Sequence, residues 1–193
     1  MIKDIRHIEK PEDLPGQQEV APRHEPQAAV VAAAAGAAWP PLILTLLIWP
    51  PDNWLPGLEM DWRLMLLGVG VFAVPAGIWT LRKERERTGR PRTRLGIVWR
   101  FMLYGGLLLG ALQALLALLQ SMIGWLNAGD VGQAAGYTET ALLIYGVGLL
   151  PLAVMVGVSY ALWAGLCVAF LAYRPKPRVR DRLGLLDDEG TAG

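Results

Sequence analysis

The chain has 193 residues, 53% of them hydrophobic, and its 18 basic residues nearly cancel its 17 acidic ones. This length suits one compact unit rather than several domains, and the single cysteine, Cys167, excludes an intrachain disulfide or a cysteine-clustered metal site. Long uncharged apolar runs alternate with short charged segments, which is typical of a polytopic membrane protein. The sequence therefore predicts an all-α integral membrane protein with four transmembrane helices.

The N-terminal segment, residues 1–27, is polar. It holds six acidic residues, four basic residues and four prolines. Such a segment buries too little apolar surface to offset the entropy lost on ordering. We therefore expect a flexible cytoplasmic tail here, followed by a four-helix transmembrane domain over residues 28–173.

The first predicted span covers about residues 28–49. As a helix, a run of this length is about 33 Å long, which is enough to cross the bilayer core. Pro40 and Pro41 lie in its middle and remove two backbone donors, so we expect the helix to kink there.

The other three spans are predicted at about residues 63–81, 95–126 and 140–173. Pro151 is the expected kink of the fourth span. The last segment, residues 174–193, is first basic and then acidic, and we expect a second cytoplasmic tail there.

The orientation follows from the distribution of lysine and arginine. The N-terminal tail, the connection between spans 2 and 3 and the C-terminal tail carry four, seven and five basic residues. The other two connections carry one and none. The positive-inside rule therefore predicts a multi-pass protein of the cell inner membrane with both termini in the cytoplasm.

Small residues recur at every fourth position of span 4 and therefore share one helix face. These predicted helix-packing residues are Ala153, Gly157, Ala161, Gly165 and Ala169. Such faces let helices approach closely in lipid, so we expect the rest of the bundle or a second copy to pack there. The alternative is that alanine and glycine are simply common in membrane helices.

A second seam of small and polar residues runs down span 3 with the heptad spacing of a left-handed helix crossing. Its members are Gly106, Gly110, Gln113, Ala117, Gln120 and Gly124. An unpaired amide is costly in the bilayer, so each glutamine needs a partner. Gln113 and Gln120 either join spans 3 and 4 by hydrogen bonds, which we favour, or line a water-filled pore in an oligomer.

Twelve basic residues of the cytoplasmic segments form a candidate contact surface for anionic lipid or an acidic cytoplasmic protein. They are Arg82, Lys83, Arg85, Arg87, Arg90, Arg92, Arg94, Arg174, Lys176, Arg178, Arg180 and Arg182. The alternative is that these charges only set the topology. No nucleic-acid partner is expected, because no aromatic platform or known binding module accompanies the charge.

Residues that carry chemistry are scarce in the spans. Apart from Arg100, near one membrane edge, no Asp, Glu, Lys, Arg or His lies at membrane depth, and we expect Arg100 to extend its guanidinium to the headgroups. Both histidines lie in the N-terminal tail, and no nucleotide-binding, HExxH or GxSxG motif occurs. We therefore predict no catalytic residue, no cofactor and no metal.

Four acidic residues of the two outer connections raise the alternative of a cation site. These are Glu59, Asp61, Asp130 and Glu139, although a solvated acidic surface is the favoured interpretation.

The leading functional hypothesis is a non-enzymatic scaffold or anchoring subunit of a membrane complex. A homo-oligomeric channel or membrane-perturbing effector is the alternative, and a membrane-embedded enzyme is the third hypothesis. The partners implied are the lipid bilayer, further copies or subunits, and an acidic cytoplasmic protein.

Overall fold

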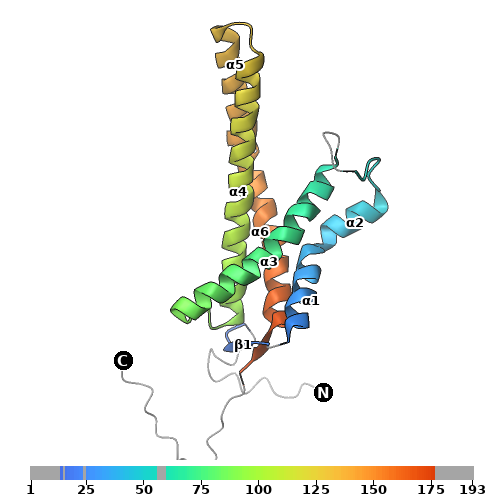
Figure 1. Cartoon of the computed structure of the whole chain (residues 1–193), viewed down its shortest axis with the longest axis vertical. Helices are drawn as coiled ribbons and strands as arrows, with labels where there is room; N and C mark the ends of the chain where they lie inside the picture. Colours follow the sequence, from blue (N-terminus) through green and yellow to red (C-terminus); the bar gives the residue numbers. More distant parts are fainter. Residues whose placement is uncertain (1–13, 15, 24, 56–59, 177–193) are drawn as a thin grey trace, which may run out of the picture.

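The computed structural model describes residues 14, 16–23, 25–55 and 60–176. Most of them are helical, and two short strands flank the helices (Figure 1). The elements in chain order are β1 (Val20–Pro22), α1 (Pro26–Ala37), α2 (Pro40–Ile48), α3 (Trp62–Thr88), α4 (Arg94–Asn127), α5 (Val131–Ala141), the π-helix η2 (Leu142–Gly148), α6 (Leu150–Cys167), the π-helix η3 (Val168–Ala172) and β2 (Tyr173–Pro175).

Three helical segments are long and apolar enough to cross a membrane: Trp62–Thr88, Arg94–Asn127 and Val131–Ala172. Helices α1 and α2 add a fourth if together they form one span. These findings confirm the prediction of a helical protein with several apolar helices long enough to span a membrane.

The first predicted span is divided into two helices, α1 and α2, whose axes differ by 55°. The break falls before Pro40 and Pro41, because proline cannot donate the backbone hydrogen bonds that would continue α1. Arg63 then caps the end of α2. Its Nη1 donates to the carbonyl oxygen of Thr45 (2.9 Å), which also accepts from the Trp49 N–H, and to that of Trp49 (2.7 Å), just past the end of the helix.

Helix α3 continues well past the apolar run that predicted it. The charged residues after Leu81 extend the helix to Thr88, since lysine, arginine and glutamate are good helix formers. Gly89 ends it in the left-handed conformation (φ 67°), where glycine carries no steric penalty.

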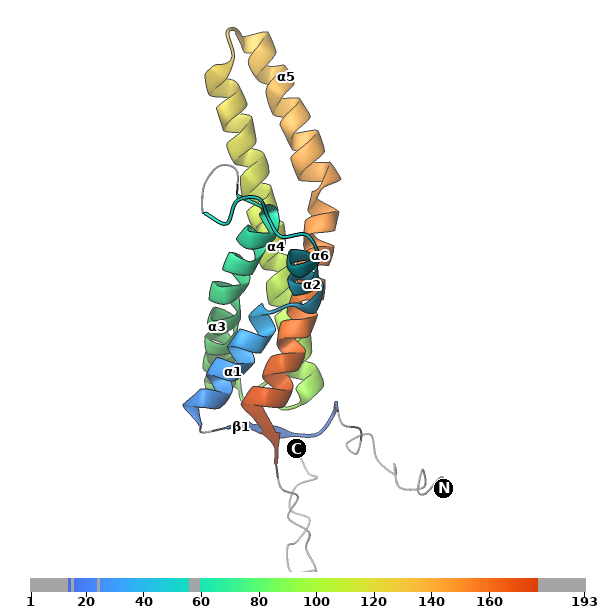
Figure 2. The same ribbon diagram turned by 90° about the vertical axis from the view of Figure 1, so that its right-hand side faces the viewer.

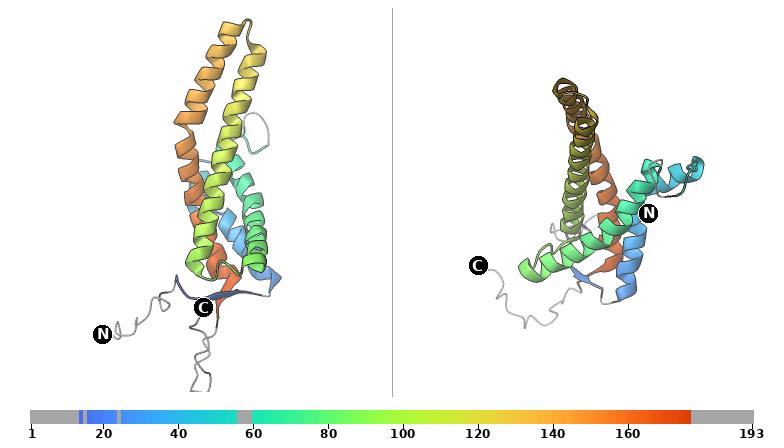
Figure 3. Two further views of the ribbon diagram at one scale, coloured as in Figure 1. Left: turned by 90° about the vertical axis from the view of Figure 1, so that its left-hand side faces the viewer. Right: turned by 45° about the horizontal axis from the view of Figure 1, so that its top comes forward.

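The last helical segment begins at Val131 rather than near residue 140. Asp130 caps this start, because its side chain accepts a hydrogen bond from the Gln133 backbone N–H at 2.8 Å. Helices α4 and α5 therefore form a long hairpin that extends beyond α1–α3 (Figures 1 and 3).

The bundle is built on the pair α4–α6, whose backbones meet at Gly105 and Gly157. A Cβ atom on Gly157 would lie 2.5 Å from the Gly105 carbonyl oxygen, and one on Gly105 would lie 2.3 Å from the Ala161 Cβ. Helix α1 packs against this pair on the α6 side and against α3 (Figure 2). The Trp163 Nε1 donates to the Ala35 carbonyl at 2.8 Å and fastens α1 to α6.

A two-stranded antiparallel sheet closes the end of the bundle at which α3 ends and α4 begins, called here the basic end. Strands β1 and β2 pair Val20 with Pro175, Ala21 with Arg174 and Pro22 with Tyr173. Val20 is fully buried. At the edge of the sheet, the Lys176 Nζ lies 3.0 Å from the Glu19 carboxylate, and its hydrogen bond lowers the pKa of Glu19.

The sheet differs from two sequence-based expectations. Residues 20–22 lie within the segment expected to be a flexible tail, but their backbone pairs with β2 and Val20 joins the core. Tyr173, expected to end span 4 as a helix, is instead extended. The residues of the two predicted tails at positions 1–13 and 177–193 lie outside the described part of the chain.

Replacing Gly157 with alanine should lower the stability of the protein by about 1–3 kcal/mol, because the new methyl group meets the Gly105 carbonyl oxygen. The matched control is Gly68→Ala in α3, where a Cβ meets nothing within 4 Å. That control should leave stability unchanged or raise it, since alanine is the better helix former. Thermal unfolding in detergent measures both, and equal midpoints would contradict the close packing of α4 on α6.

Candidate functional site

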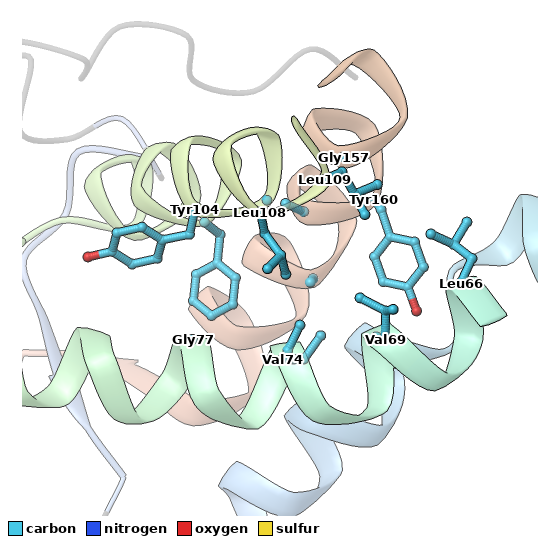
Figure 4. Close-up of a pocket in the computed structure, with 15 residues that line it drawn as sticks. Leu66, Val69, Val74, Gly77, Tyr104, Leu108, Leu109, Gly157 and Tyr160 are labelled. Atoms are coloured by element: carbon cyan, nitrogen blue, oxygen red, sulfur yellow. The ribbon is translucent and has the colours of Figure 1, made fainter. Parts of the chain in front are cut away.

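An apolar cavity of about 80 Å³ lies between α3, α4 and α6 (Figure 4). Tyr104 lies at one end of it and Tyr160 at the other. Its lining is Leu66, Val69, Gly70, Ala73, Val74, Gly77, Phe101, Tyr104, Gly105, Leu108, Leu109, Gly157, Tyr160, Ala161 and Ala164.

Glycines of α3 leave room for two aromatic side chains that line this cavity. A Cβ on Gly70 would lie 2.0 Å from the Tyr160 hydroxyl oxygen, and one on Gly77 would lie 3.0 Å from the ring of Phe101. The aromatic rings of α4 and α6 therefore enter space that any larger residue of α3 would fill.

The cavity adjoins a larger groove of about 780 Å³ between α3 and α4. The two share Val69, Ala73, Gly77, Tyr104 and Leu108. The groove exists because α3 crosses α4 at a large angle and touches it over a short stretch (Figure 1).

A polar cluster joins α3 to α4 between this groove and the basic end. The Glu84 carboxylate accepts a hydrogen bond from the Tyr104 hydroxyl at 2.7 Å and lies 2.7 Å from the Arg100 Nη2. Arg100 was expected to reach the headgroups alone, but the structure gives it a carboxylate partner. The pairing neutralises the charge of Arg100, which lowers the cost of placing it near the membrane.

The lining decides what the cavity can do. Its only polar side chains are Tyr104 and Tyr160, and both hydroxyls already donate, to Glu84 and to the Ala37 carbonyl. No nucleophile and base meet among these lining residues. The lining of the cavity is suited to contact with an apolar group, such as part of a lipid acyl chain, and offers no pair of side chains for catalysis.

The predicted packing residues of span 4 lie inside the chain's own bundle. Gly157, Ala161, Gly165 and Ala169 are buried, and Ala153 is half-buried. A Cβ on Gly165 would meet Phe101 and Val98 of α4 at 3.0 and 3.1 Å.

Small residues of span 3 face α6 in return. Cβ atoms on Gly106 and Gly110 would meet Val158 and Val154 of α6 at 2.9 and 3.2 Å. Small residues of each predicted seam thus pack on the other helix within one chain, against residues beside the opposite seam.

The two glutamines of the seam differ. The Gln113 Nε2 donates to the Tyr145 carbonyl at 2.8 Å, in the π-helical segment η2 before Pro151. This bond serves a backbone group in a distorted helix and is the interhelical contact expected of a polar seam residue. Gln120, in contrast, has an exposed side chain.

The predicted basic residues divide by environment. Lys83 lies over the Trp79 ring (4.8 Å), and Arg94 lies over the Phe170 ring (4.4 Å). Arg85 is half-buried and donates to the Val20 carbonyl. The exposed ones are Lys83 itself and Arg82, Arg87, Arg90, Arg92, Arg174 and Lys176. Arg178, Arg180 and Arg182 lie outside the described residues.

The candidate cation site is not assembled in the described part of the chain, where no three histidine, cysteine or acidic residues come together. Asp61 and Asp130 each cap a helix. A hydrogen bond from Arg63 lowers the pKa of Asp61. Glu139 is exposed, and Glu59 lies outside the described residues.

Sequence reasoning missed Glu84, Tyr104 and Tyr160. The sequence did hold a signal for Glu84. A short turn joins α3 to α4, so residues at similar distances before and after the turn, such as Glu84 and Arg100, can lie side by side. The cavity could not be predicted from the sequence, because it arises from the angle between α3 and α4.

No protein-family model matches the chain, and neither a curated protein nor a solved structure is significantly similar to it.

Replacing Gln113 with leucine should lower the free energy of unfolding by about 1 kcal/mol, because the Tyr145 carbonyl loses its donor. Gln120→Leu is the matched control and should have little effect, since this side chain is exposed. Unfolding titrations in mixed micelles measure the difference. Equal losses for the two variants would show that the Gln113 bond contributes nothing specific.

Replacing Glu84 with glutamine should lower the free energy of unfolding by about 1 kcal/mol, because Arg100 loses its countercharge. The Arg100 side chain is 38% exposed, so solvent screens the ion pair only in part. The control is Glu139→Gln, which removes an exposed carboxylate of α5. The midpoint of thermal unfolding in nanodiscs should fall for the first variant alone. A fall of the same size in both would contradict a specific role of Glu84.

Proposed function

We propose that this chain is a non-enzymatic anchoring subunit of an inner-membrane complex, with four spans and both termini in the cytoplasm. Its partners would dock on the outer hairpin, defined here as residues 111–127 of α4 together with α5 and η2. The basic end would then face the cytoplasm.

The observation that carries the proposal is the isolation of the outer hairpin. Its helices pack on each other and on α6, and the hairpin extends beyond α1–α3 (Figures 1 and 3). Large apolar side chains remain exposed along it, among them Leu126 (72%), Val131 (81%) and Val147 (71%).

Exposed apolar side chains are also expected where a helix contacts lipid. The small residues of the hairpin are therefore the stronger argument for a protein partner. Cβ atoms on Gly136 of α5 and Gly146 of η2 would meet nothing within 4 Å. In the bundle core, glycines are where backbones approach closely, as at Gly105 and Gly157. Two glycines without a neighbour therefore leave room for a further helix to approach the hairpin in the same way.

The proposed orientation is supported by the distribution of charge. The exposed arginines of the connection between α3 and α4 lie at the basic end, together with Arg174 and Lys176. The opposite ends of these helices carry only Arg63, at the start of α3, which is engaged with α2 and Asp61. This asymmetry supports a cytoplasmic basic end under the positive-inside rule.

The absence of a reactive pair in the lining of the cavity favours anchoring over catalysis. Tyr104 and Tyr160 are its only polar side chains, and each already donates a hydrogen bond.

Replacing Gly136 with leucine should dissociate the complex, because the larger side chain blocks close approach of a partner helix. The control is Gly68→Leu in α3, at an equally open site away from the hairpin. Native mass spectrometry of complexes extracted in lipid nanodiscs measures the result. Wild type and Gly68→Leu should retain a partner at fixed stoichiometry, whereas Gly136→Leu should not. A monomeric wild type, or an intact complex in Gly136→Leu, would contradict the proposal.

A homo-oligomeric channel is the second candidate, favoured by the exposed amide of Gln120 on the outer hairpin. Three or more copies of this chain without other subunits would support it, together with ion flux in liposomes that Gln120→Leu abolishes. Unchanged flux in that variant would contradict a pore lined by Gln120.

A further inference from the structure

A second cavity, of about 480 Å³, lies at the basic end between the start of α1, the last turns of α3 and the β1–β2 sheet. Unlike the apolar cavity of the bundle, its lining is mainly charged. The charged and polar residues are Arg23, Glu25, Arg82, Arg85, Glu86 and Tyr173. We call it the arginine cavity.

Two buried donors of this cavity lack a partner among the described residues. They are the Nη1 of Arg85 and the hydroxyl of Tyr173. The other terminal nitrogen of Arg85 is in use, because Nη2 donates to the Val20 carbonyl. The guanidinium also lies over the Tyr173 ring, 5.4 Å from its centre. Arg85 is therefore held in place by β1 and β2, while its Nη1 is covered and has no acceptor among the described residues.

Buried donors without acceptors are costly, and native proteins rarely retain them. Here the two belong to residues in contact with each other and lining one cavity. A ligand with several acceptor oxygens can satisfy both at once, and guanidinium groups pair especially well with phosphate.

The electrostatic field of the cavity also favours an anion. Three guanidinium groups face two carboxylates, those of Glu25 and Glu86. Helix α1 begins at Pro26 without a side-chain cap, so the positive end of its dipole lies beside the cavity, although Pro26 has no N–H and the Ala28 N–H donates to the Glu25 carbonyl. The two carboxylates disfavour a highly charged polyanion and leave room for a hydroxyl or ammonium group on the same ligand.

The position of the cavity along the helices points to the membrane surface. The apolar run of α3 ends at Leu81, one residue before Arg82, and η3 ends at Ala172, one residue before Tyr173. A cavity at this level lies where the phosphate groups of a bilayer lie. It is also open to soluble compounds from the same side.

We propose that the arginine cavity binds a phosphate group, carried by a phospholipid headgroup or by a soluble phosphate compound. Both atoms are now covered, and a turn of the Arg85 and Tyr173 side chains toward the cavity lets the phosphate accept hydrogen bonds from the Arg85 Nη1 and the Tyr173 hydroxyl, while Arg82 adds its charge. Bound there, it links α3 to the β1–β2 sheet at the start of α1. This proposal does not depend on the partner of the outer hairpin.

Two variants test the site without removing the contacts that hold the fold. Tyr173→Phe deletes only a hydroxyl that has no partner among the described residues, so the ligand-free protein should keep its stability. Arg82→Gln removes an exposed charge that lines the cavity. Their matched controls are Tyr137→Phe on α5 and Arg87→Gln, an exposed arginine that does not line the cavity.

The experiment uses the full chain in phosphate-free maltoside micelles and two probes. Inorganic phosphate represents a soluble ligand, and dioleoylphosphatidylglycerol represents a lipid headgroup, with dioleoylglycerol as its phosphate-free counterpart. Binding is measured as the rise in the thermal midpoint with probe concentration, and retained lipid is counted by native mass spectrometry.

Wild type and both controls should bind at least one probe, whereas Arg82→Gln and Tyr173→Phe should bind it about tenfold more weakly. Binding of inorganic phosphate would identify a soluble ligand as sufficient, and binding of the phospholipid alone would identify the headgroup. The proposal is overturned if neither probe binds, if dioleoylglycerol binds as well as the phospholipid, or if the two cavity variants bind like their controls.

Discussion

The close approach of α4 and α6 at Gly105 and Gly157 is the constraint on which the rest of the structure depends. Because neither residue has a side chain, the two backbones come within the distance at which an added Cβ would clash. That approach sets where Tyr160 and Trp163 of α6 stand, and both donate to carbonyl groups of α1. The position of α1 therefore follows from a contact between two other helices.

The course of helix α3 accounts for both cavities. Helix α3 packs mainly on α1 and crosses α4 at a large angle, so an apolar space remains between α3, α4 and α6. At the basic end, the charged turns of α3 continue past the apolar bundle and meet the sheet that joins the two ends of the helical region. Arg85 bridges these parts, since it contacts Val20 of β1 and Tyr173 of β2. A structural arginine thus also lines the cavity for which we propose a phosphate ligand.

The basic residues that are expected to set the topology are therefore not equivalent. Several remain exposed at the basic end, whereas Arg85, Arg94 and Arg100 lie against aromatic rings or a carboxylate of the bundle. Pairing with Glu84 explains how Arg100 is tolerated on a helix that is otherwise apolar. A count of lysines and arginines predicts orientation, but it does not distinguish charges that face solvent from those that hold elements together.

The sequence by itself determined the helical, membrane-type composition, the approximate positions of the apolar segments, the break at Pro40 and the glycine face of α6, because these depend on local hydropathy and residue size. The partner of that face, the pairing of Glu84 with Arg100 and the burial of Val20 were decided only by the tertiary structure. Each joins residues that are separated along the chain and become neighbours through a crossing angle or a strand register. Helix ends also differed from the predicted spans, as at Thr88 and Val131, because a helix continues wherever capping and backbone propensity allow, whether or not the segment is apolar.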